Sequence, residues 1–315
     1  MIGLEQIRGA VPAMSGVLHR TPLVGSATLS RLAGREIFLK LESFQKTGSF
    51  KPRGALTKLR SLTPEELARG VITISAGNHA QGVAYVATLL GARSVVVMPA
   101  AASPMKADAA RAYGAEVILH GNPAEAFAKV EEIRSERNLV FVHPFDDDAT
   151  IAGQGTVGLE IMEDLPGVDC VVVPIGGGGL IAGVALAVKS MNPRARVIGV
   201  EPVGAAAMLL SREQGKPARL PRTETIADGL AAPFAGERNF EIVEKHVDDL
   251  VVVEDASIKR AMRLLLERCK LLAEPAGAAS LAAILEGKIA GAGRTALVVS
   301  GGNVSLETLA ACLSP

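Results

Sequence analysis

Lys51 lies in the segment Ser49-Phe50-Lys51-Pro52-Arg53, where we expect a loop to enter a helix. Pro52 cannot continue a helix backwards, but proline suits the first helical turn. A lysine at the positive end of a helix, shielded from water, loses its proton more readily than a surface lysine. The neutral amine is the form that Schiff-base chemistry requires. Taken alone, however, the segment fits a surface lysine in a loop at least as well.

Two further segments follow apolar strands and open helices, a position at which free backbone N–H groups bind anions. The segment Ser75-Ala76-Gly77-Asn78-His79 could present such groups to a carboxylate, and the Asn78 amide could bind a phenolic oxygen. It could equally be an ordinary turn in which Ser75 or Asn78 caps the helix and His79 is structural. The run Gly176-Gly177-Gly178-Gly179 could surround a phosphate, because glycine allows close backbone approach.

The glycine run has a second interpretation. Gly177, Gly179 and Ala182 match a loose dinucleotide fingerprint, and Glu201 ends the next strand at a suitable distance. A nucleoside-triphosphate P-loop is not supported, because Lys189-Ser190 follows valine rather than glycine. At the end of another strand, Ser300 could offer a neutral hydroxyl to a heterocyclic nitrogen, or it could simply cap a helix.

The elements that must position these residues follow from the apolar pattern. Short apolar runs alternate with helix-like segments, which predicts parallel sheets flanked by helices in an α/β fold. The expected strands are 71–74, 94–98, 116–119, 140–142, 170–173, 197–200, 250–253 and 296–299. The expected helices are 80–90, 104–113, 124–137, 181–190, 257–269 and 277–286, and Thr63-Pro64-Glu65-Glu66 has the composition of another helix start. No charge occurs from 170 to 188, but Pro174 and the glycines would interrupt a membrane-spanning helix.

The composition limits the class of protein. Of 315 residues, 49% are hydrophobic and 21% charged, so the chain can bury a substantial core and is not a disordered polymer. Lys plus Arg and Asp plus Glu both number 33, which argues against a general nucleic-acid binder. The three cysteines are far apart, and charged residues near the N-terminus argue against a signal peptide. We therefore expect free thiols and a cytoplasmic location.

Four segments, taken together and in order, resemble one family. They are Ser-Phe-Lys-Pro-Arg-Gly-Ala (49–55), Ser-Ala-Gly-Asn-His-Ala-Gln-Gly (75–82), Gly-Gly-Gly-Gly-Leu (176–180) and Ser-Gly-Gly-Asn (300–303). They are similar to the fold-type II pyridoxal-phosphate enzymes, in the branch of threonine/serine dehydratases (threonine ammonia-lyases) and serine racemases. The similarity spans nearly the whole chain and includes segments 143–147, 153–156, 225–229 and 274–277. It implies two domains, each with a mainly parallel open sheet flanked by helices, as in the tryptophan synthase β-like fold.

The resemblance also implies a role for each matching residue. Lys51 would form the Schiff base with pyridoxal 5'-phosphate and would take the proton from the substrate Cα. The cofactor would be held further by Phe50, Asn78, Gly176, Gly177, Gly178, Gly179, Leu180 and Ser300. The substrate carboxylate would bind at Ser75, Gly77 and His79. This assignment explains the glycine match better than the dinucleotide one, in which Lys51, Asn78 and Ser300 would have no role.

The reaction implied by the resemblance is the β-elimination of water from L-threonine, and from L-serine, giving a 2-oxo acid and ammonia. With Ser300 rather than an acid facing the ring nitrogen, prompt loss of the β-hydroxyl is favoured over a long-lived carbanion. The first alternative is a serine racemase, and the second is a dehydratase for another β-hydroxy amino acid such as 3-hydroxyaspartate. Cysteine synthases, which carry out β-replacement, are less similar because they have threonine in place of His79.

Two departures from the family bear on the reaction. Racemases of this branch carry a second serine where this chain has Ala76, and alanine has no proton to deliver to the opposite face. We therefore expect racemisation to be disfavoured. In racemase-like members a divalent cation is held by a glutamate and an aspartate. Here Glu201 is retained as a weak metal candidate, but the aspartate position is Ala207.

The resemblance also predicts how the chain is organised. We expect a discontinuous large cofactor-binding domain of residues 1–47 and 144–315, and a small substrate-binding domain of residues 48–143. A homodimer or homotetramer is implied, with a small amino-acid substrate and neither nucleic acid nor membrane as partner. Asn303 lies close to the last residue, Pro315. No carboxy-terminal effector domain, and hence no feedback inhibition by isoleucine, is therefore expected.

Overall fold

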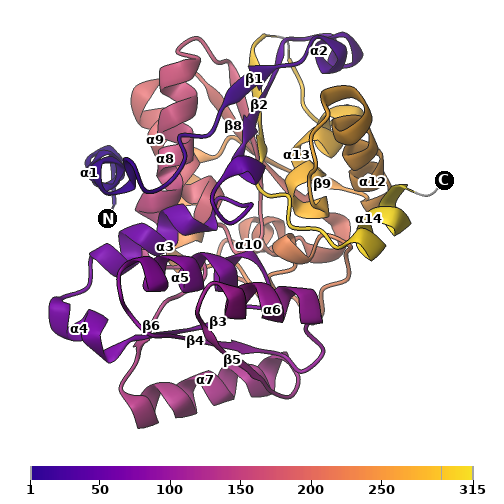
Figure 1. Ribbon diagram of the computed structural model, residues 1–315. Helices are drawn as coiled ribbons and strands as arrows, with labels where there is room; N and C mark the ends of the chain where they lie inside the picture. The colour runs from indigo at the N-terminus through magenta and orange to yellow at the C-terminus, as the bar shows by residue number, and fades with distance from the viewer. Residues whose placement is uncertain (1, 292, 314–315) are drawn as a thin grey trace.

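The computed structural model describes residues 2–291 and 293–313 and contains two open sheets, each flanked by helices (Figure 1). The larger sheet has six strands in the order β1-β2-β10-β7-β8-β9. Only its β1–β2 pair is antiparallel among the strands described. Its strands are β1 (Leu23–Gly25), β2 (Ile37–Leu41), β7 (Cys170–Pro174), β8 (Arg196–Pro202), β9 (Asp249–Val253) and β10 (Thr295–Val299).

The smaller sheet has four parallel strands in the order β5-β4-β3-β6. Its strands are β3 (Val71–Ile74), β4 (Ser94–Met98), β5 (Glu116–Leu119) and β6 (Val140–Phe141). The expected α/β fold with mainly parallel sheets is thus confirmed, and the expected strands agree with the observed ones to within two residues at each end.

The helices alternate with these strands. They are α1 (Leu4–Met14), α2 (Ala27–Ala33), α3 (Lys51–Arg60), α4 (Pro64–Arg69), α5 (Asn78–Leu89), α6 (Pro104–Ala112), α7 (Pro123–Arg137), α8 (Asp148–Asp164), α9 (Gly179–Met191), α10 (Ala207–Gln214), α11 (Glu237–His246), α12 (Asp255–Leu264), α13 (Pro275–Leu285) and α14 (Leu306–Leu313). The expected helix 257–269 is divided, because α12 continues into a π-helical turn, Leu265–Cys269. Thr63 caps α4 through a reciprocal hydrogen-bonded pair with Glu66, as its composition predicts.

The central strands of the larger sheet are buried on both faces. Val171 and Val173 of β7 pack with α8 and α9, whereas Val172 between them packs with α12 and α13. This two-sided burial explains why the strand is apolar at every position rather than at alternate ones. Segment 170–188 is β7, the glycine turn and most of α9, and no helix in the described part of the chain is long and apolar enough to cross a membrane.

We propose domain boundaries at 47/48 and 143/144. All strands of the smaller sheet fall between these positions, and all strands of the larger sheet fall outside them. Helix α3 follows the first boundary and packs against both α5 and α8. Figure 1 shows it between the two sheets, so its first residue, Lys51, lies at their junction.

Candidate active site

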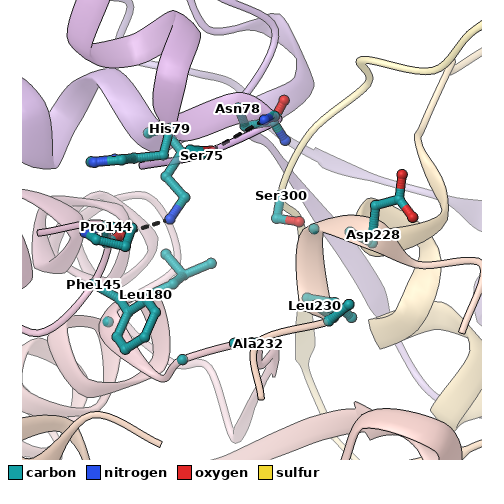
Figure 2. Close-up of a pocket in the computed structure, with 18 of the residues that line it drawn as sticks. Ser75, Asn78, His79, Pro144, Phe145, Leu180, Asp228, Leu230, Ala232 and Ser300 are labelled. Carbon is teal, nitrogen blue, oxygen red and sulfur yellow. Dashed lines mark hydrogen bonds between the residues drawn. The ribbon is translucent and has the colours of Figure 1, made fainter. Parts of the chain in front are cut away.

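A cavity of about 560 Å³ lies between the two sheets. Its wall combines the loops after β3, β7 and β10 with the start of α3, so each expected segment contributes to one site (Figure 2). Since the carboxyl ends of parallel strands meet at one edge of a sheet, loops distant in sequence converge there. The residues expected to bind cofactor and substrate, namely Phe50, Lys51, Ser75, Gly77, Asn78, His79, Gly176, Gly177, Gly178, Gly179, Leu180 and Ser300, all line this cavity.

Lys51 is the first residue of α3, and Pro52 follows it within the first turn as expected. Its side-chain amine donates a hydrogen bond of 2.9 Å to the carbonyl oxygen of Pro144, which Figure 2 shows as a dashed line. Loss of hydration lowers the pKa of the amine to about 8, although the negative charge of Glu274 acts in the opposite direction. At this pKa roughly a tenth of the amine is neutral at pH 7, far more than for an ordinary lysine, and the neutral form is the one that a nucleophile or base requires.

The glycine run forms the turn between β7 and α9, and a side chain would not fit there. A Cβ on Gly177 would collide with the ring of Phe145, and Gly178 has a φ of +98° in the left-handed region. Gly178 precedes the first residue of α9 and has no side chain to cap that helix. The N-terminal N–H groups of α9 therefore adjoin the cavity with close backbone access, which suits the phosphate of a cofactor.

The Asn78 side chain is held between two other polar groups. Its amide donates to Glu274 Oε1 at 2.6 Å, and its carbonyl oxygen accepts from Asn303 Nδ2 at 2.8 Å. The second N–H of the Asn78 amide can still bind a cofactor oxygen, because a primary amide has two donors. Burial raises the pKa of Glu274 to about 7, while its bond from Asn78 favours the ionised form.

The turn after β3 is fixed by Ser75, whose hydroxyl accepts the N–H of Gly77 at 3.1 Å. Helix α5 then begins at Asn78, so the first N–H groups of this helix border the cavity. The ring of His79 is directed elsewhere, since its Nε2 lies 3.3 Å from the Val142 carbonyl oxygen. Burial, together with the charge of Lys51, holds the pKa of His79 well below its usual value, so the ring is neutral.

Ser300 follows β10 and lines the cavity (Figure 2). Because α14 begins only at Leu306, Ser300 is not the cap of a helix. Its backbone carbonyl accepts the N–H of Phe50, which ties the entrance of α3 to the end of β10. The Lys51 amine lies 5.1 Å from the centre of the Phe50 ring.

Glu201, the weak metal candidate, lies at the end of β8 and is 1% exposed. Its two carboxylate oxygens accept the N–H groups of Met208 and Leu209 at 2.8 Å each, at the start of α10. Burial raises its pKa to about 7. No group of three or more histidine, cysteine, aspartate or glutamate residues in the described ranges is arranged to hold a metal ion.

Several groups at the site were not singled out from the sequence. Glu274 lies in the cavity wall beside Asn78, and the carbonyl of Pro144 receives the Lys51 amine. Both fall in segments that the family resemblance includes, 274–277 and 143–147, and this was the available signal. Lys106 and Asp228 also line the cavity and form an ion pair of 2.7 Å.

The fold and site together define a class of enzyme. A lysine amine of lowered pKa shares one cavity with a glycine turn that could hold a phosphate, and a neutral serine hydroxyl lines the same cavity. This set of groups fits pyridoxal phosphate. The chain belongs to the pyridoxal-phosphate dependent enzymes, since the model of that family matches residues 14–301.

Individual relatives and solved structures are similar to this chain over most of its length. The chain is 48% identical to an L-threonine ammonia-lyase of Thermotoga maritima over 98% of this chain and 77% of the relative. Among solved structures, the processed form of threonine deaminase isoform 2 of Solanum lycopersicum has a TM-score of 0.93 at 37% identity, over 98% of this chain and 86% of the other. The serine racemase of maize has a TM-score of 0.94 at 40% identity, over 98% and 96% of the two chains.

Proposed function

We propose that the chain catalyses the elimination of water from L-threonine, and from L-serine, to give a 2-oxo acid and ammonia. The observation that carries this proposal is the Lys51 amine of lowered pKa, enclosed in one cavity with the glycine turn. The relatives named L-threonine ammonia-lyase and threonine deaminase support the same reaction.

Lys51, Phe50, Asn78, Ser300 and the 176–180 turn would hold the cofactor. When bound, pyridoxal phosphate supplies the electron sink that makes the substrate Cα–H acidic. Once displaced by the substrate amine, Lys51 would be the base that takes the Cα proton. Its pKa of about 8 in the unliganded chain is close to neutral pH, where a general base is most effective.

The substrate carboxylate would bind at the start of α5. Ser75 fixes the turn by accepting the N–H of Gly77, Gly77 leaves room because it has no side chain, and the first N–H groups of α5 attract anions. His79 would act through its backbone, because its ring is hydrogen-bonded to Val142. We infer that this loop holds the substrate by its common amino-acid part and leaves the β-hydroxyl directed elsewhere in the cavity.

Two neutral residues favour elimination over racemisation. Ser300 provides a hydroxyl where an acid would be needed to keep a ring nitrogen protonated. Ala76 lines the cavity but has no proton to deliver to the opposite face of the substrate. A serine racemase is nevertheless the second candidate, because the maize serine racemase aligns over 98% of this chain.

The experiment is an assay of the purified, cofactor-loaded protein with L-threonine, L-serine and 3-hydroxyaspartate. Production of 2-oxo acid and ammonia is measured, with D-serine determined in parallel by chiral chromatography. We expect 2-oxobutyrate from threonine as the main product and little D-serine. If D-serine forms faster than pyruvate, the racemase is the better assignment. If 3-hydroxyaspartate is the preferred substrate, the dehydratase reaction stands but the threonine assignment fails.

The assembly and location are proposals as well. We propose a homodimer or homotetramer in the cytoplasm, and the free thiols Cys170, Cys269 and Cys312 are consistent with a reducing compartment. Size-exclusion chromatography with light scattering tests the assembly.

We propose a structural role for Glu201 as the cap of α10, supported by its two hydrogen bonds to backbone N–H groups.

A further inference from the structure

The Lys51 amine has one fixed hydrogen-bond acceptor in this structure, the carbonyl oxygen of Pro144 at 2.9 Å. Under the proposed function this amine must act while it is free, after the substrate has displaced it. A flexible lysine side chain would then explore many positions, and small displacements of a base from its proton reduce rates strongly. The position of the Pro144 carbonyl therefore bears directly on the reaction.

His143 closes the turn that contains this carbonyl. Its Nδ1 accepts the N–H of Phe145 at 3.2 Å and the N–H of Asp146 at 2.7 Å, closing a tight turn around Pro144. Both partners are backbone donors, so Nδ1 must be the unprotonated nitrogen and the imidazole is neutral. Partial burial lowers the pKa of His143, which is consistent with that state. The arrangement resembles the turns that asparagine and aspartate side chains close over their own backbone.

The same segment is anchored on both sides. Asp146 accepts the N–H groups of Glu237 and Arg238 at the start of α11, at 3.1 and 3.0 Å. Asp147 caps α8 through Thr150 and forms an ion pair of 2.7 Å with Lys58 of α3. The turn is therefore fixed to three helices, and one of them is the helix that begins with Lys51.

Phe145 extends this support to the other half of the cofactor site. Its ring lies where a Cβ of Gly177 would be, and its carbonyl oxygen lies 2.8 Å from the Cβ position of Gly179. Its carbonyl also accepts the side-chain amide of Asn239 at 3.1 Å, and this amide bonds the Gly177 carbonyl at 2.8 Å as well. One short turn thus contacts both the lysine and the glycine run.

We propose that His143 is a positioning residue: by closing the 143–146 turn through Nδ1, it sets the Pro144 carbonyl that holds the free Lys51 amine, and the Phe145 ring that supports the phosphate site. This inference rests on the proposed function for the part that concerns catalysis. The part that concerns cofactor binding stands independently of which amino acid is the substrate.

The test uses two amide replacements of similar chemistry but different reach. In His143→Asn the side-chain oxygen occupies the position of Nδ1 and can close the turn, whereas in His143→Gln it lies one bond further out. We expect His143→Asn to keep kcat and the pyridoxal-phosphate dissociation constant within about threefold of the unmodified protein. We expect His143→Gln to lower kcat about tenfold to 100-fold, with KM changed less than about threefold, because the loss concerns the base and not substrate binding.

Two measurements besides activity complete the test. The dissociation constant of pyridoxal phosphate, measured by fluorescence titration of the apo-protein, should rise about tenfold for His143→Gln and stay unchanged for His143→Asn. The visible circular dichroism band of the bound cofactor reports a fixed asymmetric environment. This band should weaken for His143→Gln and stay unchanged for His143→Asn. Thermal melts of both variants show that the comparison is made on folded protein.

The inference is overturned if His143→Asn and His143→Gln behave alike, whether both variants keep or both lose these properties. It is also overturned if His143→Gln lowers kcat only in proportion to a loss of folded protein. If the unmodified protein produces no 2-oxo acid from any β-hydroxy amino acid, the proposed function fails. The cofactor affinity and the dichroism band would still decide the role of His143.

Discussion

Two cationic side chains of α3, only two positions apart, experience opposite electrostatic surroundings. Arg53 is 1% exposed and meets two carboxylates, Glu42 at 2.8 Å and Glu160 at 2.6 Å. These partners raise the pKa of its guanidinium in spite of burial. The Lys51 amine meets only a neutral carbonyl at hydrogen-bond distance, and burial lowers its pKa to about 8.

The Arg53 cluster is balanced in charge. Lys40, which is 0% exposed, donates to Glu160 at 2.5 Å, so two basic and two acidic side chains share one interior site. Thr21 and Thr156 bond Arg53 as well, at 3.3 and 3.0 Å. The difference between the two regions shows that burial alone does not make a group reactive. A basic group shielded from water shifts toward its neutral, reactive form where it has no carboxylate partner, and it stays charged and stabilises the fold where carboxylates surround it.

The largest effect should follow from removing the Lys51 amine. Lys51→Ala removes the proposed base and the amine that holds the cofactor, so 2-oxo acid production should fall at least about 1,000-fold. Borohydride treatment should then no longer fix pyridoxal phosphate to the protein, as judged by mass spectrometry. The melting temperature should change little, because the amine has no charged partner at hydrogen-bond distance. Unchanged 2-oxo acid production would exclude the proposed role.

Removing the structural cation should instead reduce stability. Arg53→Met removes the ion-pair partner of Glu42 and leaves Glu160 paired with Lys40 alone, and breaking such a buried pair costs about 3–5 kcal/mol. Denaturant unfolding of the variant measures this cost. The double variant Arg53→Met with Glu42→Gln restores the charge balance and should recover part of the loss. A loss below about 1 kcal/mol, or no recovery in the double variant, would contradict this account of the cluster.

A smaller effect concerns the pKa of Lys51 itself. Only the neutral amine is alkylated, so in the apo-protein the labelling of Lys51 should rise with pH through about 8. Glu274 has a pKa of about 7 and is mostly ionised there, and its charge favours the ammonium form. Glu274→Gln should therefore shift the labelling midpoint to lower pH. Reductive methylation followed by peptide mass spectrometry measures this, with exposed Lys216 as the internal reference. A shift to higher pH would show that Glu274 acts on Lys51 in some other way.

The smallest effect is expected from a change that leaves both charged regions intact. Ala76→Ser adds a hydroxyl to the cavity wall and could supply the missing proton donor on the opposite substrate face. The ratio of D-serine to pyruvate formed from L-serine should rise several-fold, while elimination is retained. Chiral chromatography gives the ratio. No rise in D-serine over the unmodified protein would count against the proposed role of position 76.

Much of this site could be predicted because its recognition elements are short backbone motifs. The Lys51 segment and the glycine run lie at strand ends or helix starts. These positions can be predicted from neighbouring residues in the sequence. Glu274 and Pro144 could not be identified in the same way, because they meet Asn78 and Lys51 from 196 and 93 residues away. Only the folded sheets bring such residues together.

The elements that went unpredicted have a physical explanation. Strand β2 contains Lys40, which interrupts its apolar pattern and is accommodated because its amine pairs with Glu160 and donates to the Thr21 carbonyl. Helix α8 contains three glycines, which disfavour helix formation locally. One of them, Gly155, is required by packing, since a Cβ there would lie 2.6 Å from Ile7 and 3.0 Å from the Gly183 carbonyl. In both cases tertiary contacts override the local preference.

The position of β10 has a consequence for biosynthesis. This strand follows the other described strands in the sequence, yet it lies inside the larger sheet, between β2 and β7. A growing chain therefore cannot join β2 to the rest of its sheet, or bring Ser300 to Lys51, until the ribosome has released residues near 300. The smaller sheet, whose strands are contiguous in the sequence, is free to form earlier. The complete cofactor cavity thus exists only in a chain that extends past β10, and products truncated before that strand cannot sequester the cofactor in it.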